Sequence, residues 1–296
     1  MFNNFNLSGG LTLGQSPLGL LLLLVMSSAY AKDDVAYLAM SDGYWQVWMM
    51  DADGKNSHAL THTPYDKSRI SWYPNNDALL VSGNQGELVK LALNGQESPV
   101  QIQEKNVNDA VLSPDGHYMA YSYKPEGNIF NKLVLKNMET GEVTKIAWMQ
   151  GFQHEPMFSH DSKTLYFLSG ESGQTHDIWQ YNLVTRNQEA ITVGSLYNLD
   201  VAPSAQGKLA FSSNRSGNYE IWVKDGNSLR MLTNDPVLDG RPNWAGEKDV
   251  YFESSNQGVM NIWMVTDSKN VKAKQITFSK EGARYPLFRA ASKVTK

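Results

Sequence analysis

The residue types most often used in catalysis are sparse in this sequence and fall into no catalytic spacing. There is no cysteine, which excludes thiol nucleophiles, disulfide frameworks and thiolate metal sites. The six histidines show no H-E-x-x-H pattern. The sequence also lacks the G-x-S-x-G elbow of serine hydrolases and the G-x-x-x-x-G-K-[ST] phosphate loop. We therefore expect no metal site, no cofactor and no motif-borne catalytic residue.

One segment begins like a calcium loop. Asp51-Ala52-Asp53-Gly54 has the first two acidic positions, but Lys55 occupies the third ligand position and no glutamate stands at the twelfth. An Asp-Gly pair between two apolar runs is typical of a tight turn between strands. The segment is therefore interpreted as a turn.

Composition limits the class of protein. The chain has 296 residues, of which 41% are hydrophobic and 19% charged, with a net charge of −4. These proportions are typical of a folded chain rather than a disordered one. A mildly acidic chain without a basic run argues against nucleic acid as a partner. The 32 aromatic residues and 23 glycines favour short strands joined by tight turns.

Residues 1–31 are interpreted as a signal peptide. They contain no charged side chain, an apolar run covers residues 18–26, and Ala29 and Ala31 form an A-x-A cleavage site. The run is too short for the roughly 20 residues that span a bilayer. No basic side chain precedes it, so an uncleaved anchor is the alternative. We expect a periplasmic or secreted protein whose mature part, residues 32–296, has no membrane span.

The mature part consists of a repeated unit. An aliphatic-Trp pair recurs at residues 47–48, 178–179, 221–222 and 262–263, and the last three copies lie 43 and 41 residues apart. A second apolar column precedes each pair, and a Leu-Thr or related pair follows it, as at Leu60-Thr61 and Leu232-Thr233. Four strands in 40–46 residues are typical of a propeller blade. The recurrent Trp residues are expected to pack between blades.

A further column supplies the first strand of each blade. Its central residues are spaced by 40 to 46 positions: Trp72, Leu112, Phe158, Val201, Trp244 and Phe288. The sequence thus predicts an all-β, six-bladed β-propeller with four antiparallel strands per blade. The last copy, residues 286–290, is predicted to pair with the strands of residues 35–61 and close the ring.

Three segments resemble the TolB-type propeller repeat: SPDGHYMAYS (residues 113–122), VWMMDADG (47–54) and RMLTNDP (230–236). The resemblance extends over residues 33–296 and implies the propeller fold. In TolB the propeller follows an α/β domain, whereas here only a few residues separate the predicted cleavage site from the first strand. The same repeat occurs in peptidases and in pectin-fragment lyases, and TolB itself binds a protein partner at its channel mouth.

The loops that lead into the first strands are predicted to line one mouth of the central channel. Three positions before each central residue stand Arg69, Asp109, Glu155, Asn198, Arg241 and Tyr285, and His154 and Arg284 adjoin them. Such a ring of mixed charge could clamp a ligand or peptide through Arg forks and carboxylates. The alternative is that these are solvated residues paired with one another.

Two functions from different classes follow. The first is an exported, non-catalytic module that recognises a cell-envelope protein or peptide at the channel mouth. The second is an enzyme acting on an oligosaccharide, similar to the pectin-fragment lyases, with Asp109 and Glu155 as acid and base. A purely architectural propeller is a third alternative. Trp45 and Trp148 are off the repeat register and are candidates for exposed contact surfaces.

Overall fold

The computed structural model describes residues 34–146, 151–170, 175–194, 196–268 and 271–289. The predicted signal peptide, residues 1–31, and Trp148 lie outside these residues. The described part consists of strands, turns and loops, and it contains no helix long and apolar enough to cross a membrane.

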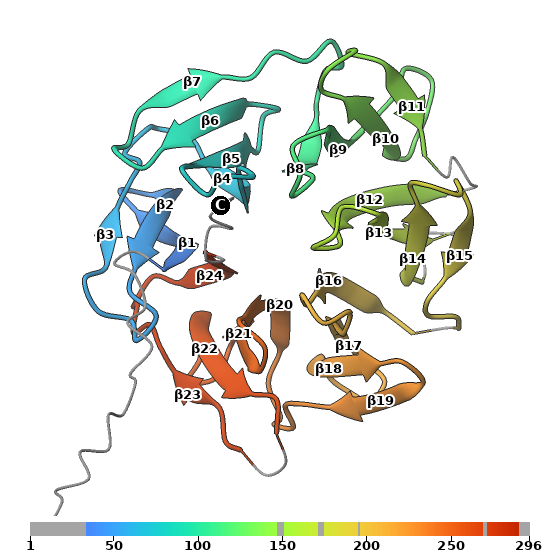
Figure 1. Cartoon of the computed structure of the whole chain (residues 1–296). Helices are drawn as coiled ribbons and strands as arrows, with labels where there is room; N and C mark the ends of the chain where they lie inside the picture. The colour runs from blue at the N-terminus through green and yellow to red at the C-terminus, as the bar shows by residue number, and fades with distance from the viewer. Residues whose placement is uncertain (1–33, 147–150, 171–174, 195, 269–270, 290–296) are drawn as a thin grey trace, which may run out of the picture.

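The strands form six sheets of four antiparallel strands, arranged as blades around a central channel (Figure 1). Blades 1 to 3 consist of β4 (Lys67–Trp72), β5 (Ala78–Gly83), β6 (Leu88–Ala92) and β7 (Glu97–Pro99); β8 (Asn108–Leu112), β9 (Tyr118–Tyr123), β10 (Lys132–Asn137) and β11 (Val143–Lys145); and β12 (Phe152–Phe158), β13 (Thr164–Gly170), β14 (Asp177–Asn182) and β15 (Gln188–Ala190).

Blades 4 to 6 continue the ring. They consist of β16 (Asn198–Pro203), β17 (Leu209–Ser213), β18 (Glu220–Asp225) and β19 (Ser228–Met231); β20 (Asp239–Ala245), β21 (Asp249–Ser254), β22 (Asn261–Thr266) and β23 (Lys274–Gln275); and β24 (Ala283–Phe288), β1 (Val35–Ser41), β2 (Tyr44–Met50) and β3 (His58–Ala59). The prediction of six four-stranded blades is confirmed.

Blade 6 joins the two ends of the described chain. Its order is β24-β1-β2-β3, and β24 pairs antiparallel with β1, with Val35 opposite Phe288 and Ala39 opposite Ala283. The closing strand, β24, lies nearest the channel, and β3 lies at the rim (Figure 1). The predicted closure by the C-terminal segment is therefore confirmed.

The core lies between the blades. Trp48, Trp179, Trp222 and Trp263 are half-buried, and each packs against a cluster that combines residues of two neighbouring blades. The Trp263 cluster, for example, joins Val223 of blade 4 to Phe252 of blade 5. Face-to-face packing of sheets explains why these strands are apolar on both faces. The predicted packing role of the recurrent Trp residues is confirmed.

The threonine of the Leu-Thr or related pair ties four of the six blades together near the mouth. In blade 4 the Thr233 hydroxyl accepts a hydrogen bond from the Ile221 amide at 2.9 Å and donates one to Glu220 at 2.7 Å. Thr61, Thr192 and Thr277 make the same pair of bonds to the third strands of their own blades. The recurrence of threonine thus has a hydrogen-bonding cause.

Candidate functional site

A bulge in every first strand turns one side chain towards the channel. The register of the first strand against the second shifts by the bulge in all six blades. In five blades the bulged residue has a positive φ, between 48° and 58°: Asp109, Glu155, Asp200, Arg241 and Tyr285. Left-handed backbone is uncommon for residues other than glycine, and bulges re-aim side chains near functional sites. In blade 1 the register shift falls one residue earlier, between Lys67 and Arg69, and Arg69 follows it directly.

Carboxylates hold these bulges in place across the blade junctions. The Asp109 carboxylate accepts a hydrogen bond from the amide of Glu155 at 3.4 Å, and Asp200 accepts one from the amide of Arg241 at 3.2 Å. Glu253, on β21, accepts one from the amide of Tyr285 at 3.0 Å. The amide that the bulge leaves unpaired therefore donates to a carboxylate of the preceding blade. This hydrogen bond offsets the cost of burying the amide.

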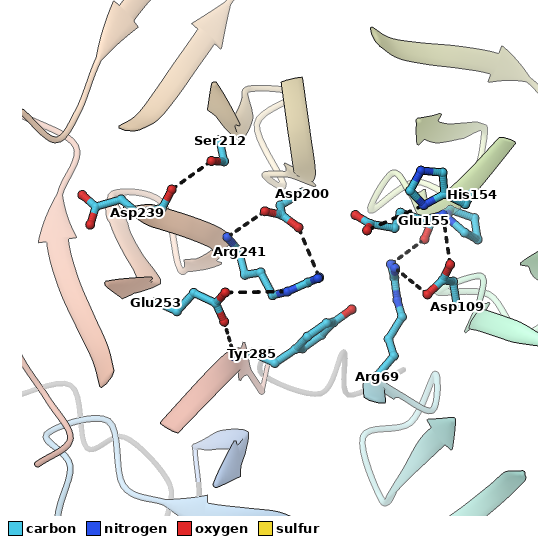
Figure 2. Close-up of polar contacts among 11 residues, drawn as sticks. Arg69, Asp109, His154, Glu155, Asp200, Ser212, Asp239, Arg241, Glu253 and Tyr285 are labelled. Atoms are coloured by element: carbon cyan, nitrogen blue, oxygen red, sulfur yellow. Dashed lines mark hydrogen bonds and ion pairs between the residues drawn. The ribbon is translucent and has the colours of Figure 1, made fainter. Parts of the chain in front are cut away.

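Two guanidinium groups flank a tyrosine ring in the channel (Figure 2). Arg241 lies 3.1 Å from an Asp200 oxygen and 3.8 Å from a Glu253 oxygen, and its guanidinium is 4.8 Å from the centre of the Tyr285 ring. Arg69 approaches the same ring at 5.8 Å. Its guanidinium lies 3.6 Å from Asp109. The arrangement is thus a set of positive charges balanced by carboxylates around one aromatic ring.

Arg69 also crosses to a distant blade. Its Nη2 donates a hydrogen bond to the Pro156 carbonyl at 2.9 Å, which connects β4 of blade 1 to β12 of blade 3. The side chain is only 5% exposed. A buried guanidinium needs such acceptors because desolvation is costly.

The predicted placement of Asn198 in this ring is wrong by two residues. Asp200 occupies the bulge of blade 4, while Asn198 is buried behind it, where its side-chain oxygen accepts hydrogen bonds from Ser213 at 2.9 Å and Arg215 at 2.7 Å. Val201 as the strand centre leads to Asn198, whereas Ser204 marks the turn that follows the strand. The Ser204 hydroxyl accepts the amide hydrogen bond that Ser113 and Ser159 accept in blades 2 and 3. Alignment on this serine would have identified Asp200.

His154 and Arg284 lie beside the ring rather than in it. The His154 ring packs edge-on against Phe152 at 5.0 Å and His176 at 5.8 Å. Burial lowers the pKa of His154 to about 4, so the imidazole is neutral at pH 7 and forms no ion pair with Glu155. Arg284 lies 3.9 Å over the ring of Trp45, which is half-buried by that contact.

Glu155 is the channel carboxyl most affected by its surroundings. Burial and the negative charge of Asp200 raise its pKa to about 7, against the opposing effect of Arg241. Protonation therefore changes the charge of the channel near neutral pH.

This shift predicts a pH dependence of stability. Because the folded pKa lies above the unfolded value of about 4.3, the stabilisation is complete below that value and is lost as the pH rises through 7. Glu155→Gln is uncharged throughout. Its melting midpoint should exceed that of the wild type by about 5 °C at pH 8, with the difference vanishing towards pH 4. Thermal melts across this range measure it.

The exposed turn residue Glu247 provides the matched control, because Glu247→Gln should follow the wild-type curve. Parallel pH curves for Glu155→Gln and the wild type would contradict the prediction.

The cavity between these side chains is small. It encloses about 30 Å³, room for roughly two water molecules, and is lined by Arg69, Glu155, Asp200, Arg241 and Tyr285 together with flanking residues of the same strands. The cavity therefore has no room for a sugar ring or a peptide side chain. Such a ligand would contact these groups from the channel mouth.

Comparisons with known proteins agree with this architecture. No protein-family profile matches the chain. The Tol-Pal system protein TolB of Francisella tularensis subsp. holarctica is 33% identical over 152 residues, which cover 51% of this chain and 33% of that protein. The matched region is thus about a third of the length of this relative.

Solved structures match over most of the chain. The crystal structure of TolB from Acinetobacter baumannii matches with a TM-score of 0.75 and 19% identity, covering 86% of this chain and 66% of that one. The structure of a putative TolB from Agrobacterium tumefaciens matches with a TM-score of 0.67 and 20% identity, covering 88% and 100%. This chain is therefore a closed six-bladed β-propeller whose fold is similar to that of the TolB structures.

Proposed function

We propose that the chain is an exported, non-catalytic binding module that recognises a cell-envelope protein or peptide at its channel mouth. The observation that carries the proposal is the ring of left-handed bulges. Five side chains of mixed charge project from left-handed bulges, and the amides of Glu155, Arg241 and Tyr285 are held by hydrogen bonds to carboxylates of the preceding blades. Such preorganisation lowers the cost of binding.

The side chains suggest the chemistry of the partner. Arg69 and Arg241 flank the Tyr285 ring, and Asp200 lies within 3.1 Å of Arg241. A peptide segment that brings its own carboxylate could pair with an arginine, while its backbone amides face the channel carboxylates. Similarity to a Tol-Pal system protein supports an envelope partner, and the apolar segment of residues 1–31 supports export.

One observation favours an oligosaccharide-acting enzyme instead. A carboxyl group with a pKa near 7 is suited to acid-base chemistry, and Glu155 lies next to Asp109. Against this, the cavity of about 30 Å³ beside Glu155 does not admit a sugar ring, and Asp109 is not among the residues that line it. Cleavage of uronate oligomers in the presence of a divalent metal, lost in Glu155→Gln, would favour the enzyme.

The binding proposal predicts a loss of capture in channel variants. The immobilised mature chain should retain an envelope protein from an extract, whereas Arg241→Ala and Arg69→Ala should each weaken that capture about tenfold or more, because each removes a charge preorganised for the partner. Titration of the purified partner against each variant measures the effect.

Lys274→Ala, on the outermost strand β23, is the matched control and should bind like the wild type. Equal capture by the wild type and both arginine variants would contradict binding at the mouth and favour an architectural role. Melting curves of the same samples separate lost contacts from lost folding.

A further inference from the structure

Two blade junctions have matching sequences but opposite charge. Residues 60–69, LTHTPYDKSR, lead from blade 6 into blade 1, and residues 232–241, LTNDPVLDGR, lead from blade 4 into blade 5. The two segments align without a gap from the Leu-Thr pair to the channel arginine. Lys67 in the first corresponds to Asp239 in the second.

In the first junction the ammonium group of Lys67 occupies a buried polar site. It donates hydrogen bonds to the Gln46 side-chain oxygen at 3.2 Å, to the Thr63 hydroxyl and to the Tyr65 carbonyl at 3.0 Å. The residue is fully buried. A cation is thus held at this junction by oxygen atoms from the third strand of one blade and from the loop into the next.

The junction of blades 2 and 3 also holds an ammonium group at the equivalent place. There the lysine belongs to the preceding blade, whereas Lys67 belongs to the following blade. Lys132 starts the third strand of blade 2, the position that Gln46 has in blade 6. Its ammonium group donates to the Gly151 carbonyl at 2.5 Å and to the Gln153 side-chain oxygen at 3.3 Å, in the loop and first strand of blade 3. The same place between blades therefore holds a positive charge twice, supplied by different strands.

In the junction of blades 4 and 5 the equivalent side chains are all acidic. Glu220 replaces Gln46, Asp235 replaces Thr63, and Asp239 replaces Lys67. Oxygen atoms of the three carboxylates lie within 4.8 Å of one another, and Glu220 and Asp239 are fully buried. Both oxygens of Asp239 are buried without a hydrogen bond.

Hydrogen-bond donors reach Glu220 and Asp235 but leave the oxygens of Asp239 without a partner. Glu220 accepts hydrogen bonds from the Asp235 amide at 3.0 Å and the Thr233 hydroxyl at 2.7 Å, and Asp235 accepts one from the Val237 amide at 3.1 Å. The Asn218 amide nitrogen lies within hydrogen-bond distance of Glu220 at 3.0 Å, the Asp235 carbonyl at 2.6 Å and the Val237 carbonyl at 2.8 Å. It has two hydrogens for three acceptors. The hydroxyl groups of Thr233 and Ser254 lie near the Asp239 carboxylate, and the Thr233 hydroxyl already donates its hydrogen to Glu220. Among the residues that the structure describes, no lysine or arginine forms an ion pair with Glu220, Asp235 or Asp239.

We propose that a divalent cation of the calcium type binds between blades 4 and 5, held by Glu220, Asp235 and Asp239, where Lys67 holds its ammonium group in the junction of blades 6 and 1. Two carboxylate-bearing strands and a loop with inward carbonyl groups provide the irregular oxygen site that calcium prefers over the octahedral site of magnesium. The ion would replace the missing ammonium and satisfy the orphaned oxygens of Asp239.

The site lies apart from the channel but connects to it. Asp239 is two residues before Arg241 on β20, and Figure 2 shows its carboxylate turned away from the channel. Its backbone carbonyl accepts a hydrogen bond from Ser212 of blade 4 at 2.8 Å. The ion would therefore fix the junction that presents Arg241.

Calcium titration of the chelator-treated full chain tests the proposal. Calcium should bind with a stoichiometry of one and raise the melting midpoint by about 5 °C at a concentration of about 100 times the dissociation constant. Asp239→Asn should abolish the shift. Asp225→Asn, an exposed carboxylate on the same β18 strand as Glu220, should keep it.

A triple variant copies the lysine junction. Glu220→Gln, Asp235→Thr and Asp239→Lys together place an internal ammonium where the ion would bind. This variant should melt in chelator at or above the chelated wild type, and calcium should leave its midpoint unchanged. No calcium binding by the wild type, or a calcium shift that persists in the triple variant, would overturn the proposal.

Discussion

Removal of residues 283–296 should lower the melting midpoint by more than 10 °C or prevent folding. This deletion takes away β24, whose Ala283, Tyr285 and Leu287 are buried against the neighbouring blades. Burial of a large apolar side chain contributes about 1.5–3 kcal/mol, and each kcal/mol corresponds to about 2–4 °C in a chain of this size. The loss also exposes the edge of β1, which can then pair with other chains.

The segment contributes more than one strand pairing. The Arg289 side chain donates hydrogen bonds to the Asn76 carbonyl at 2.6 and 3.0 Å, and its amide donates to the Asp34 carbonyl at 2.7 Å. Figure 1 shows β24 beside β1 at the channel, between the first strands of blades 5 and 1, so its removal opens the ring between these two blades.

Circular dichroism melts of the two truncated chains measure the effect. A shorter deletion, residues 290–296, keeps every described contact of the closure and should shift the midpoint by less than about 2 °C. An unchanged midpoint after removal of residues 283–296 would show that the ring is not held by this strand.

The number of blades and their closure could be predicted because each strand carries its own apolar pattern. A Trp that packs between two sheets recurs at the same position of the repeat. The number of blades can therefore be counted from the repeats alone, without knowledge of contacts. The incomplete set of strands at one end and the single extra copy at the other determine the closure.

The channel ring was only partly predictable, since it depends on a backbone feature. Four of the five left-handed bulge positions follow from constant spacing to the centre of the strand. In blade 4 the sequence DVAPSAQ lacks the Ser-Pro-Asp marker, and the same spacing leads to Asn198 instead of Asp200. Glu253 could not be found in this way. It comes from the second strand, and only the fold brings it to the amide of Tyr285.

The junction sites were missed for a related reason. The equivalence of Lys67 with Asp239 is visible in the sequence, but that of Lys67 with Lys132 is not, because the two lysines arise from different strands and share only the position of their ammonium groups. Alignment of the repeats identifies equivalent backbone positions. It does not identify side chains that start from different strands and end at the same place.

Arg69→Ala should destabilise the fold by about 3 kcal/mol, which corresponds to a loss of about 8 °C. The side chain is buried, bridges blades 1 and 3 through the Pro156 carbonyl, and lies 3.6 Å from Asp109. Its removal leaves a buried carbonyl without a donor and a carboxylate without its counter-charge, which is costlier than the loss of one exposed contact. Urea denaturation of the variant measures the effect.

The size of the loss is limited by one feature of the wild type. The Nε of Arg69 is buried without a hydrogen bond, so the native residue carries a desolvation cost that its removal relieves. We therefore expect a value near the lower end of the 3–5 kcal/mol typical of broken buried pairs.

A second substitution separates the charge effect from the packing effect. Asp109→Asn in the Arg69→Ala background removes the uncompensated carboxylate and should recover about 1 kcal/mol, whereas the same change in the wild type should destabilise. Additive losses in this cycle would mean that Arg69 and Asp109 are not coupled. In that case a loss of partner capture in Arg69→Ala would reflect a lost contact at the mouth rather than a relaxed ring, and the capture experiment would report binding directly.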